Sequence, residues 1–408
     1  MRRYTALLAA SVLLLSAAIA SAEDWPAFRG PRGDGISKET GLLDNFPATG
    51  LKKLWSDTVG IGYSSPVAVD GKVYLFSTVL DNDGLQKDTL KCYDADTGKT
   101  LWTASYNNAW TGAYPGTRCS PLIEGDRIYT YGGAGDLAAW EIASGKSVWQ
   151  VNVLKQTDAT PCQWGQASNP LIIGNLIYVQ CGKNGPVAVA VNKTSGKIVW
   201  QSEKGLGGYT QPVLADVEGT KQLIIFGGDN IWAMNPETGK TIWKYPWKTQ
   251  YDVNSATPIY RDGNLFLTSN YNHGCIMLKL SPTSATKLWE NKEVMSRFQA
   301  LILEGNVLYA NSEGTIKCLS WPDGAVKWAN KDFRLDMGGS VVRVGDKFVI
   351  LAQNGKLALA SGGPDGFKLI SQAQLVQGKE VWSSPLVYKG KLYAKGATDF
   401  ICVEFSTK

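Results

Sequence analysis

The feature that most constrains the fold is a nine-residue pattern that recurs along the chain and ends in tryptophan. Its clearest form is D-A-D-T-G-K-T-L-W, and its copies end at Trp102, Trp149, Trp200, Trp243, Trp289, Trp328 and, in a degenerate copy, Ile370. Counting from Trp55, which stands in a similar context near the start, the spacings are 47, 47, 51, 43, 46, 39 and 42 residues. A repeat of this length predicts an array of small, similar structural units.

Each unit also opens in the same way, with an apolar segment, a Gly-bearing turn and a second, alternating segment. The openings fall at Pro66, Pro121, Pro170, Pro212, Pro258, Ala300, Ser340 and Pro385. Alternation between apolar and polar residues around such turns predicts antiparallel strands, and Pro as the first residue of a strand costs no hydrogen bond. Four strands per unit and eight openings predict an all-β chain folded as an eight-bladed β-propeller.

The last unit, from Trp382 to Phe405, has sequence for only three strands. The segment Leu51–Thr58 has the pattern of the missing outer strand, with Trp55 in the position of the recurring tryptophan. Pairing the two ends of the chain in one blade would close the ring and remove its exposed sheet edges. The propeller is therefore predicted to span residues 51–408, with the last blade closed by the N-terminal strand.

The residues before the propeller predict export. Residues 1–22 combine Arg2 and Arg3 with a short apolar run and small residues before Glu23, the layout of a signal peptide cleaved near Ala22/Glu23. Residues 23–50 are rich in Pro and Gly and predict an irregular arm laid over the outside of the disc. We expect a soluble, periplasmic or secreted monomer with no membrane span.

Charge and composition exclude several classes of function. The net charge is +5 and the chain has no cluster of Lys or Arg, so nucleic-acid binding is not indicated. His273 is the single histidine, so a metal site built on several imidazoles or a Ser-His-Asp triad is not indicated. We therefore predict no metal site and assign no catalytic residue.

Seven cysteines in an exported chain permit disulfide bonds but leave at least one thiol unpaired. Cys92 and Cys318 occupy positions where other units carry a small apolar residue, and Cys402 lies in the matching strand of the last unit. We therefore expect these three thiols in the core. We predict a Cys162–Cys181 disulfide, with Cys119–Cys162 as the rival pairing.

The segment A-D-T-G-K-x-x-W at residues 95–102 resembles the tryptophan-docking repeat of pyrroloquinoline-quinone (PQQ) dehydrogenases. The same repeat occurs in the propeller lipoprotein of the outer-membrane β-barrel assembly machinery. Through W-P-A-F-R-G-P-R-G-D-G-I-S, G-Y-S-S-P-V-A-V-D-G-K-V-Y and similar segments, the whole mature chain is similar to exported PQQ-binding-like β-propeller repeat proteins. The resemblance implies the fold strongly and the activity weakly, because one fold hosts many functions.

The mouth of the central channel is the predicted functional site, because inner strands line the axis and residues two apart share a face. Positions one and three residues before each opening, with nearby connections, supply the candidate ligand-binding residues Tyr63, Arg118, Trp164, Asn169, Tyr209, Gln211, Asp252, Asn254, Arg297, Gln299 and Trp382. Arginine beside aromatic rings suits a planar or anionic ligand. The competing interpretation is that these polar residues only hydrate a water-filled channel. For the repeated tryptophans we expect packing of blade against blade rather than a stacking platform for a cofactor, because a ligand needs one platform and not seven.

The preferred functional hypothesis is a cell-envelope scaffold that holds a small molecule, a glycan or an envelope protein at the channel mouth, with Arg118 and Arg297 dispensable for stability. The alternative is a divergent PQQ-dependent alcohol or sugar dehydrogenase, so whether the chain is an enzyme stays open. The resemblance implies PQQ with calcium as cofactor, yet the mouth positions hold no acid, Asp252 is the nearest one, and no two cysteines are adjacent. A role in outer-membrane protein assembly is the lesser alternative, and the missing lipid-anchor Cys counts against it.

Overall fold

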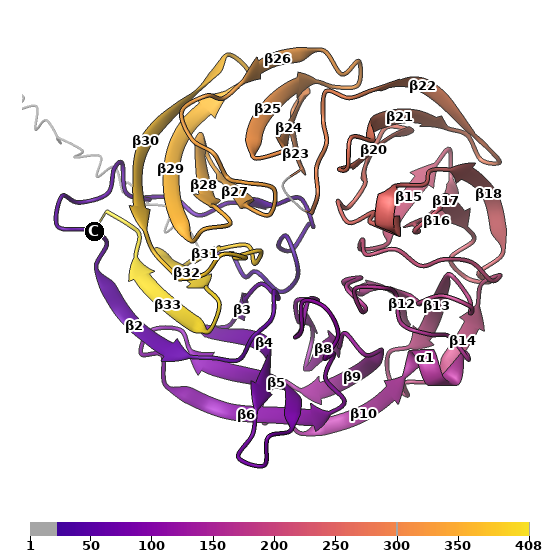
Figure 1. The fold of residues 1–408 in the computed structure, drawn as a ribbon, viewed down its shortest axis with the longest axis horizontal. Helices are drawn as coiled ribbons and strands as arrows, with labels where there is room; N and C mark the ends of the chain where they lie inside the picture. The colour runs from indigo at the N-terminus through magenta and orange to yellow at the C-terminus, as the bar shows by residue number, and fades with distance from the viewer. Residues whose placement is uncertain (1–22, 299–300, 408) are drawn as a thin grey trace, which may run out of the picture.

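The computed structural model describes residues 23–298 and 301–407, over which eight sheets stand around a central axis like the blades of a propeller (Figure 1). The predicted all-β, eight-bladed architecture is confirmed. The predicted signal peptide, residues 1–22, and the candidate residue Gln299 lie outside the described residues.

The first four blades follow one another along the chain, each running from its inner to its outer strand. Blade 1 consists of β3(Val67–Val69), β4(Lys72–Leu80), β5(Gln86–Asp94) and β6(Thr100–Asn107). Blade 2 consists of β7(Leu122–Glu124), β8(Arg127–Tyr131), β9(Asp136–Glu141) and β10(Ser147–Asn152). Blade 3 consists of β11(Leu171–Ile173), β12(Leu176–Gln180), β13(Ala188–Asn192) and β14(Ile198–Gln201). Blade 4 consists of β15(Val213–Val217), β16(Thr220–Phe226), β17(Asn230–Met234) and β18(Thr241–Pro246).

The next three blades keep this order, and two short helices, α1(Val153–Gln156) and η1(Gln250–Asp252), lie in connections between blades. Blade 5 consists of β19(Ile259–Arg261), β20(Asn264–Ser269), β21(Gly274–Leu280) and β22(Ala285–Asn291). Blade 6 consists of β23(Leu301–Glu304), β24(Val307–Ser312), β25(Thr315–Ser320) and β26(Val326–Ala329). Blade 7 consists of β27(Ser340–Val344), β28(Lys347–Leu351), β29(Lys356–Gly363) and β30(Gly366–Gln374), with the short strand β1(Ile36–Ser37) added at its inner edge.

Blade 8 contains both ends of the propeller chain. Its inner strands are β31(Leu386–Tyr388), β32(Lys391–Lys395) and β33(Asp399–Glu404), and its outer strand is β2(Lys53–Thr58). β2 runs antiparallel to β33, with Trp55 opposite Cys402. The predicted closure of the last blade by the N-terminal strand is thus confirmed, and the ring has no unpaired end.

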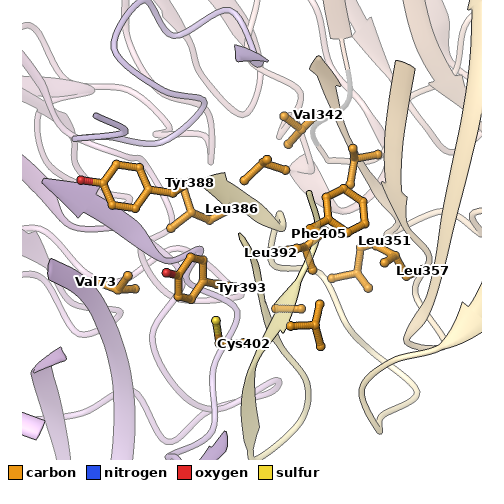
Figure 2. Close-up of a cluster of buried hydrophobic side chains, with 14 of the residues drawn as sticks. Val73, Val342, Leu351, Leu357, Leu386, Tyr388, Leu392, Tyr393, Cys402 and Phe405 are labelled. Atoms are coloured by element: carbon orange, nitrogen blue, oxygen red, sulfur yellow. The ribbon is translucent and has the colours of Figure 1, made fainter. Parts of the chain in front are cut away.

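The hydrophobic core lies between the blades rather than in one central mass. Each large cluster of buried side chains joins neighbouring blades, such as blades 1 and 2 or blades 2 and 3. The largest cluster joins blades 7, 8 and 1 at the closure, where Val342, Tyr393 and Val73 come from the three blades (Figure 2). Cys402 is part of this cluster, and Cys92 and Cys318 are equally buried between other blades, as predicted.

Six of the recurring tryptophans lock one blade to the next. Trp55 donates its indole N–H to the carbonyl oxygen of Ala95 at 3.2 Å, and its ring lies against Gly98 in the turn before β6. Gly98 has φ +71°, and a Cβ atom there would lie 2.5 Å from the indole ring, so the position requires glycine. Trp102, Trp149, Trp200, Trp289 and Trp328 make the same kind of N–H to carbonyl bond to the following blade. Blade packing, not ligand stacking, explains their recurrence.

The first part of the N-terminal arm, residues 25–37, lies in the central channel, so the prediction that the whole arm covers the outside of the disc is wrong. Trp25 exchanges backbone hydrogen bonds with Ala68 on the inner strand of blade 1, and the carbonyl of Pro26 accepts the N–H of Ile123 on blade 2. β1 then pairs in parallel with β27, with Ile36 opposite Arg343. Inner strands carry unpaired backbone groups along the channel, and the arm pairs with such groups of blades 1, 2 and 7. Figure 1 shows the indigo segment entering the centre of the disc.

The arm enters and leaves the channel through the same face. Asp24 accepts the backbone N–H of Asp70 in the β3–β4 turn at 3.2 Å, and Glu39 accepts that of Lys389 in the β31–β32 turn at 2.8 Å. Both turns lie opposite the connections that lead from one blade to the next. The arm is therefore a loop inserted from one face, and we call the other face, where the blade-to-blade connections lie, the mouth face.

All seven cysteines are free thiols, so the predicted Cys162–Cys181 disulfide and its rival Cys119–Cys162 are not formed. The Cys162 sulfur lies against backbone carbonyls, 3.8 Å from the oxygen of Cys181 and 3.5 Å from that of Gly207. The Cys119 thiol is 3.2 Å from the carbonyl of Ser168. The pairing inferred from shared position fails because each thiol is buried against backbone carbonyl groups instead.

Candidate functional site

The mouth face holds a pocket of about 450 Å³ on the propeller axis. Its lining, which we call the mouth pocket, consists of Phe28, Tyr63, Ser65, Tyr114, Arg118, Trp164, Ala167, Asn169, Tyr209, Gln211, Tyr251, Val253, Ser255, Thr257, Tyr271, Arg297, Phe298 and Trp382. Phe28 comes from the inserted arm, so the arm closes the pocket from below. The channel is therefore a blind pocket that opens on one face.

The mouth pocket brings together most of the predicted site residues. Tyr63, Arg118, Trp164, Asn169, Tyr209, Gln211, Arg297 and Trp382 all line it. Seven of the eight positions three residues before a strand opening contribute, and Met337 is the exception. Each lies on the connection that leads from the outer strand of one blade to the inner strand of the next, which explains why one offset selects one ring of side chains.

Two predicted residues do not line the pocket. Asp252 lies on η1 beside the pocket and is absent from its lining. Asn254 is fully buried, where its Nδ2 donates to the carbonyl of Gly227 at 2.7 Å and its Oδ1 accepts the hydroxyl of Ser269 at 2.7 Å. Asn254 thus ties the connection between blades 4 and 5 to both blades, because its polar atoms are already satisfied there.

The ring of residues one position before the openings has a structural role that the sequence did not suggest. The N–H of Ser384 donates to the hydroxyl of Ser65 at 2.9 Å, the N–H of Ser65 to the hydroxyl of Ser120 at 3.0 Å, and the N–H of Ser120 to Oδ1 of Asn169 at 2.7 Å. Gln211 continues the series by donating to the carbonyl of Pro170 at 3.1 Å. These polar groups join blades 8, 1, 2, 3 and 4 around the pocket rather than serving only as its hydrated wall.

Trp382 is the centre of an aromatic cluster on one wall. Its ring stacks on Tyr63 at 4.5 Å with 28° between the planes, and it meets Phe298 at 4.8 Å and Tyr114 at 5.3 Å at steeper angles. The indole N–H donates to Oε1 of Gln353 at 3.1 Å, which fixes the orientation of the ring. Burial raises the pKa of Tyr63, and the nearby carboxylate of Glu380 adds to the effect, so its hydroxyl stays protonated.

Two connections between blades, residues 108–117 and 157–166, border the pocket, and we call them the first and the second overhang. Trp110 of the first overhang packs against the second. A Cβ atom at Gly165 would lie 2.8 Å from the Trp110 ring, and one at Gly133 would lie 2.6 Å from Trp110 Cβ, so both glycines allow close packing. The tip residue Tyr114 reaches Trp164 of the other overhang at 5.8 Å between ring centroids. Trp164 in turn packs with Cys162, Tyr209 and Val253.

The two arginines of the pocket differ in how they are held. Arg118 donates from Nη1 to the carbonyl of Gly116 at 3.0 Å and from Nη2 to the carbonyls of Ala113 and Tyr114, so it braces the first overhang. Burial lowers the pKa of Arg118 to about 10, which still leaves it charged at neutral pH. Arg297 donates from Nη2 to the hydroxyl of Tyr271 at 3.0 Å and lies over its ring at 4.9 Å.

Several lining residues were not predicted from the sequence. Phe28 arrives through the inserted arm, and Tyr271 comes from the turn between β20 and β21 rather than from a blade-to-blade connection. Tyr251 and Phe298 lie on such connections but at other offsets from the opening. No spacing rule based on the repeat could select these residues. The aromatic residues of Y-D-V-N-S and S-R-F-Q were the one signal that the sequence offered.

The pocket does not fit a calcium-dependent quinone site. Calcium takes six to eight oxygen ligands, usually including carboxylates. None of the described residues that line the pocket is acidic, and the described part of the chain contains no group of three or more His, Cys, Asp or Glu side chains suited to a metal. The aromatic rings also tilt against one another instead of leaving a slot between parallel faces.

Within the described residues, no helix has both the length and the hydrophobicity that crossing a bilayer requires.

Comparisons with known proteins agree with this geometry. A PQQ-repeat family model described as outer membrane protein assembly factor BamB matches residues 86–330. BamB of Yersinia pestis is 24% identical over 301 residues, which cover 69% of this chain and 70% of that protein. The quinoprotein alcohol dehydrogenase PedH of Pseudomonas putida is 28% identical over 141 residues, covering 32% of this chain and 23% of the dehydrogenase. This chain therefore matches about a quarter of the length of that enzyme.

The fold comparison extends over nearly the whole chain. The crystal structure of the quinohemoprotein alcohol dehydrogenase of Comamonas testosteroni superposes with a TM-score of 0.66 at 13% identity, covering 94% of this chain and 81% of the other. At that identity the likeness concerns the fold alone. The family match covers more than half of the sequence, and it falls on the blades whose tryptophans dock as described. The chain therefore belongs to the BamB-like family of PQQ-repeat β-propellers.

Proposed function

We propose that the protein is a non-catalytic, exported propeller that holds a ligand of the cell envelope in the mouth pocket. The observation that carries the proposal is the blind, aromatic pocket with two arginines and no acidic residue among its described lining. Its volume of about 450 Å³ is within the range of small-molecule sites. A channel that only conducted or stored water would not need an arm that closes it from below.

Export is part of the proposal. The sequence of residues 1–22 supports it, and the first described residue, Glu23, already interacts with the folded arm through an ion pair with Arg32. N-terminal sequencing of the protein purified from its native host should give Glu23 as the first residue. Recovery of the intact N-terminus from the cytoplasm would contradict export.

The binding role is tested by filling the pocket. Ser255→Trp places a large side chain in the lining, whereas Met337→Trp places the same side chain at the equivalent position of blade 7, outside the pocket. We expect wild type and Met337→Trp to co-purify with the same compound or polypeptide from native envelopes, detected by mass spectrometry, and Ser255→Trp to lose it. Retention by Ser255→Trp, with its melting temperature unchanged, would place binding elsewhere.

A divergent PQQ-dependent alcohol or sugar dehydrogenase is the alternative, supported by the sequence match to quinoprotein dehydrogenases. The lack of acidic lining residues argues against it. Adding PQQ and calcium to the purified protein and measuring dye reduction with alcohols and sugars decides between the two. A bound chromophore with substrate-dependent dye reduction would establish the enzyme.

A role in outer-membrane protein assembly is the lesser alternative, favoured by a match that covers over two thirds of both this chain and BamB of Yersinia pestis. In that case the mouth face would bind another protein. Chemical crosslinking in intact cells should then join the protein to components of the assembly machinery. The absence of such products, in cells where a bound small molecule is recovered, would favour the pocket ligand.

A further inference from the structure

Two arginines line the mouth pocket, and none of its described lining residues is acidic. These are Arg118 and Arg297, and among the described residues neither takes part in an ion pair. Charged groups withdrawn from water are costly unless an opposite charge accompanies them. A ligand that carries a negative charge would supply the missing partner.

Arg297 is the group placed to meet that charge. The hydrogen bonds that Arg118 donates all go to backbone carbonyls of the first overhang. Arg118 would therefore attract a negatively charged ligand mainly through its positive charge and not through a direct hydrogen bond. Arg297 makes one bond, to the Tyr271 hydroxyl, and its buried Nε has no hydrogen-bond partner among the described residues. Trp164 also lines the pocket, and its indole N–H is likewise unpaired within the described part of the chain. The pocket therefore contains N–H donors that no described residue accepts from, which favours a ligand with acceptor oxygens.

The arrangement of the rings indicates the shape of the ligand. Tyr63 and Trp382 are the near-parallel pair, and they touch each other at 4.5 Å, so nothing can enter between them. Phe298 and Tyr114 meet Trp382 at 47° and 46°, and Tyr114 meets Trp164 at 60°. Flat aromatic ligands bind best by offset stacking on an open parallel face. Rings that tilt toward one another instead form a rounded bowl that suits a saturated ring with C–H groups on its faces.

The polar groups between the rings suit a ligand with many hydroxyls. Tyr251, Tyr271, Ser255 and Thr257 each carry a hydroxyl that can both donate and accept, and Gln211 adds an amide. These groups occupy one arc of the lining, and the aromatic cluster around Trp382 occupies another. A sugar ring presents the same combination of an apolar face and a hydroxyl-bearing edge.

We infer that the mouth pocket binds a carboxylate-bearing saccharide, with the carboxylate on Arg297 and the sugar rings packed among the tilted aromatic side chains. The inference deepens the proposed binding function and rests on it. It names a uronic-acid type of sugar as the ligand chemistry, as opposed to a neutral glycan or a flat aromatic acid.

The test measures binding of a panel of acidic oligosaccharides to the full mature chain by calorimetry and tryptophan fluorescence. The panel contains oligogalacturonate, oligomannuronate and hyaluronan fragments, each with its carboxyl-reduced counterpart, and benzene-1,3,5-tricarboxylate as a flat anion. We expect at least one acidic sugar to bind, its reduced form to bind about tenfold more weakly or worse, and affinity to fall with added salt. Arg297→Gln should lose the same factor, whereas Arg127→Gln, on the opposite face, should bind like wild type.

Three results would overturn the inference: no acidic sugar binds, reduced sugars bind as well, or the flat anion binds more tightly than every sugar. Failure of the inference is distinguishable from failure of the proposed function. If native capture still depends on the pocket in the Ser255→Trp experiment, only the ligand class is wrong. If Ser255→Trp captures the native ligand as well as wild type does, the pocket is not the binding site and both proposals fail.

Discussion

Tyr63 stacks on Trp382 with ring centroids 4.5 Å apart, and the contact joins the two ends of the propeller chain at the wall of the mouth pocket. Tyr63 follows β2, the N-terminal strand that completes blade 8, and Trp382 leads into β31, the inner strand of the same blade. The same pair of rings therefore contributes both to the closure of the propeller and to the shape of the pocket. Stabilising the closure also orders the wall on which a ligand would rest.

The first prediction concerns the energy of this pair. In a double-mutant cycle with Tyr63→Leu and Trp382→Leu, we expect a coupling of about 0.5–1.5 kcal/mol beyond the separate losses. Urea denaturation of the four proteins gives the value. The cycle of Tyr63→Leu with Trp247→Leu, a residue that does not line the pocket, should give a coupling near zero. Equal coupling in both cycles would mean that the stacking contact adds nothing specific.

The second prediction concerns the lock between blades 4 and 5, which differs from the others. Trp243 is 8% exposed and donates its N–H to Oε1 of Gln222 at 2.9 Å, and Gln222 donates to the carbonyl of Ser281 in blade 5 at 2.8 Å. Trp243→Ala should lower the free energy of unfolding by ~3–5 kcal/mol because it empties a buried site. Gln222→Ala should cost about 1–3 kcal/mol, because it leaves the indole N–H and a carbonyl unpaired.

Both losses are measurable by chemical denaturation. Trp243→Phe, which keeps most of the ring volume, should lose clearly less than Trp243→Ala. A loss within experimental error for Trp243→Ala would remove the packing role assigned to this residue.

The propeller could be predicted because its stabilising contacts recur in the sequence. In most units the turn glycine precedes the tryptophan by the same number of residues, and the tryptophan of one unit packs against the turn of the next unit across the blade interface. The same regularity located the pocket, since one offset from the strand openings selects one ring of side chains. The closure of the last blade could also be predicted from the register of the repeat, since Trp55 pairs with Cys402.

The path of the arm and the state of the cysteines could not be predicted, because their contacts do not recur in the sequence. Trp25 and Arg29 occupy the channel through contacts that occur once in the chain, so no repetition marks them. Asn254 looked like a pocket residue by its place in a connection between blades, yet its amide is used by Gly227 and Ser269. Single, non-repeated contacts of this kind depend on the three-dimensional path of the chain, which spacing alone does not give.

The third prediction revises the expectation that both arginines are dispensable for stability. Arg118→Gln should lower the free energy of unfolding by about 1–3 kcal/mol, because three carbonyl oxygens of the overhang lose a charged donor. Arg297→Gln should cost less than about 1 kcal/mol, since among the described residues it gives up one hydrogen bond, to Tyr271, and its contact with that ring. Thermal and urea denaturation of the two variants side by side measure both effects. Equal losses would show that Arg297 is as structural as Arg118.

The fourth prediction follows from the free cysteines. Burial raises the pKa of the Cys162 thiol to about 12, and all seven thiols are buried. The native protein, purified from the envelope without reductant, should show no rapid reaction with a thiol reagent at pH 8. After unfolding in guanidinium chloride, still without reductant, seven thiols should titrate. A count of five would establish one disulfide bond.

The fifth prediction concerns Asp88, a carboxylate buried between blades 1 and 2. Burial raises its pKa from 3.8 to about 6, although Thr78 donates a hydrogen bond to it at 2.6 Å. Between about pH 4 and 6 the folded protein therefore binds a proton that the unfolded chain has released. Because stability falls with pH wherever the folded state binds more protons, the ionised carboxylate costs roughly 2–3 kcal/mol at pH 7.

Asp88→Asn keeps the shape of the side chain and removes the titration. The difference in unfolding free energy between Asp88→Asn and wild type should shift in favour of the variant as the pH rises from 4 to 7, measured by urea denaturation at each pH. Asp94→Asn is the matched control with the opposite sign, because hydrogen bonds from Thr97 lower the pKa of Asp94, and its contribution is lost as the pH falls. If the Asp88 difference were constant across this range, the buried carboxylate would not titrate as its surroundings require.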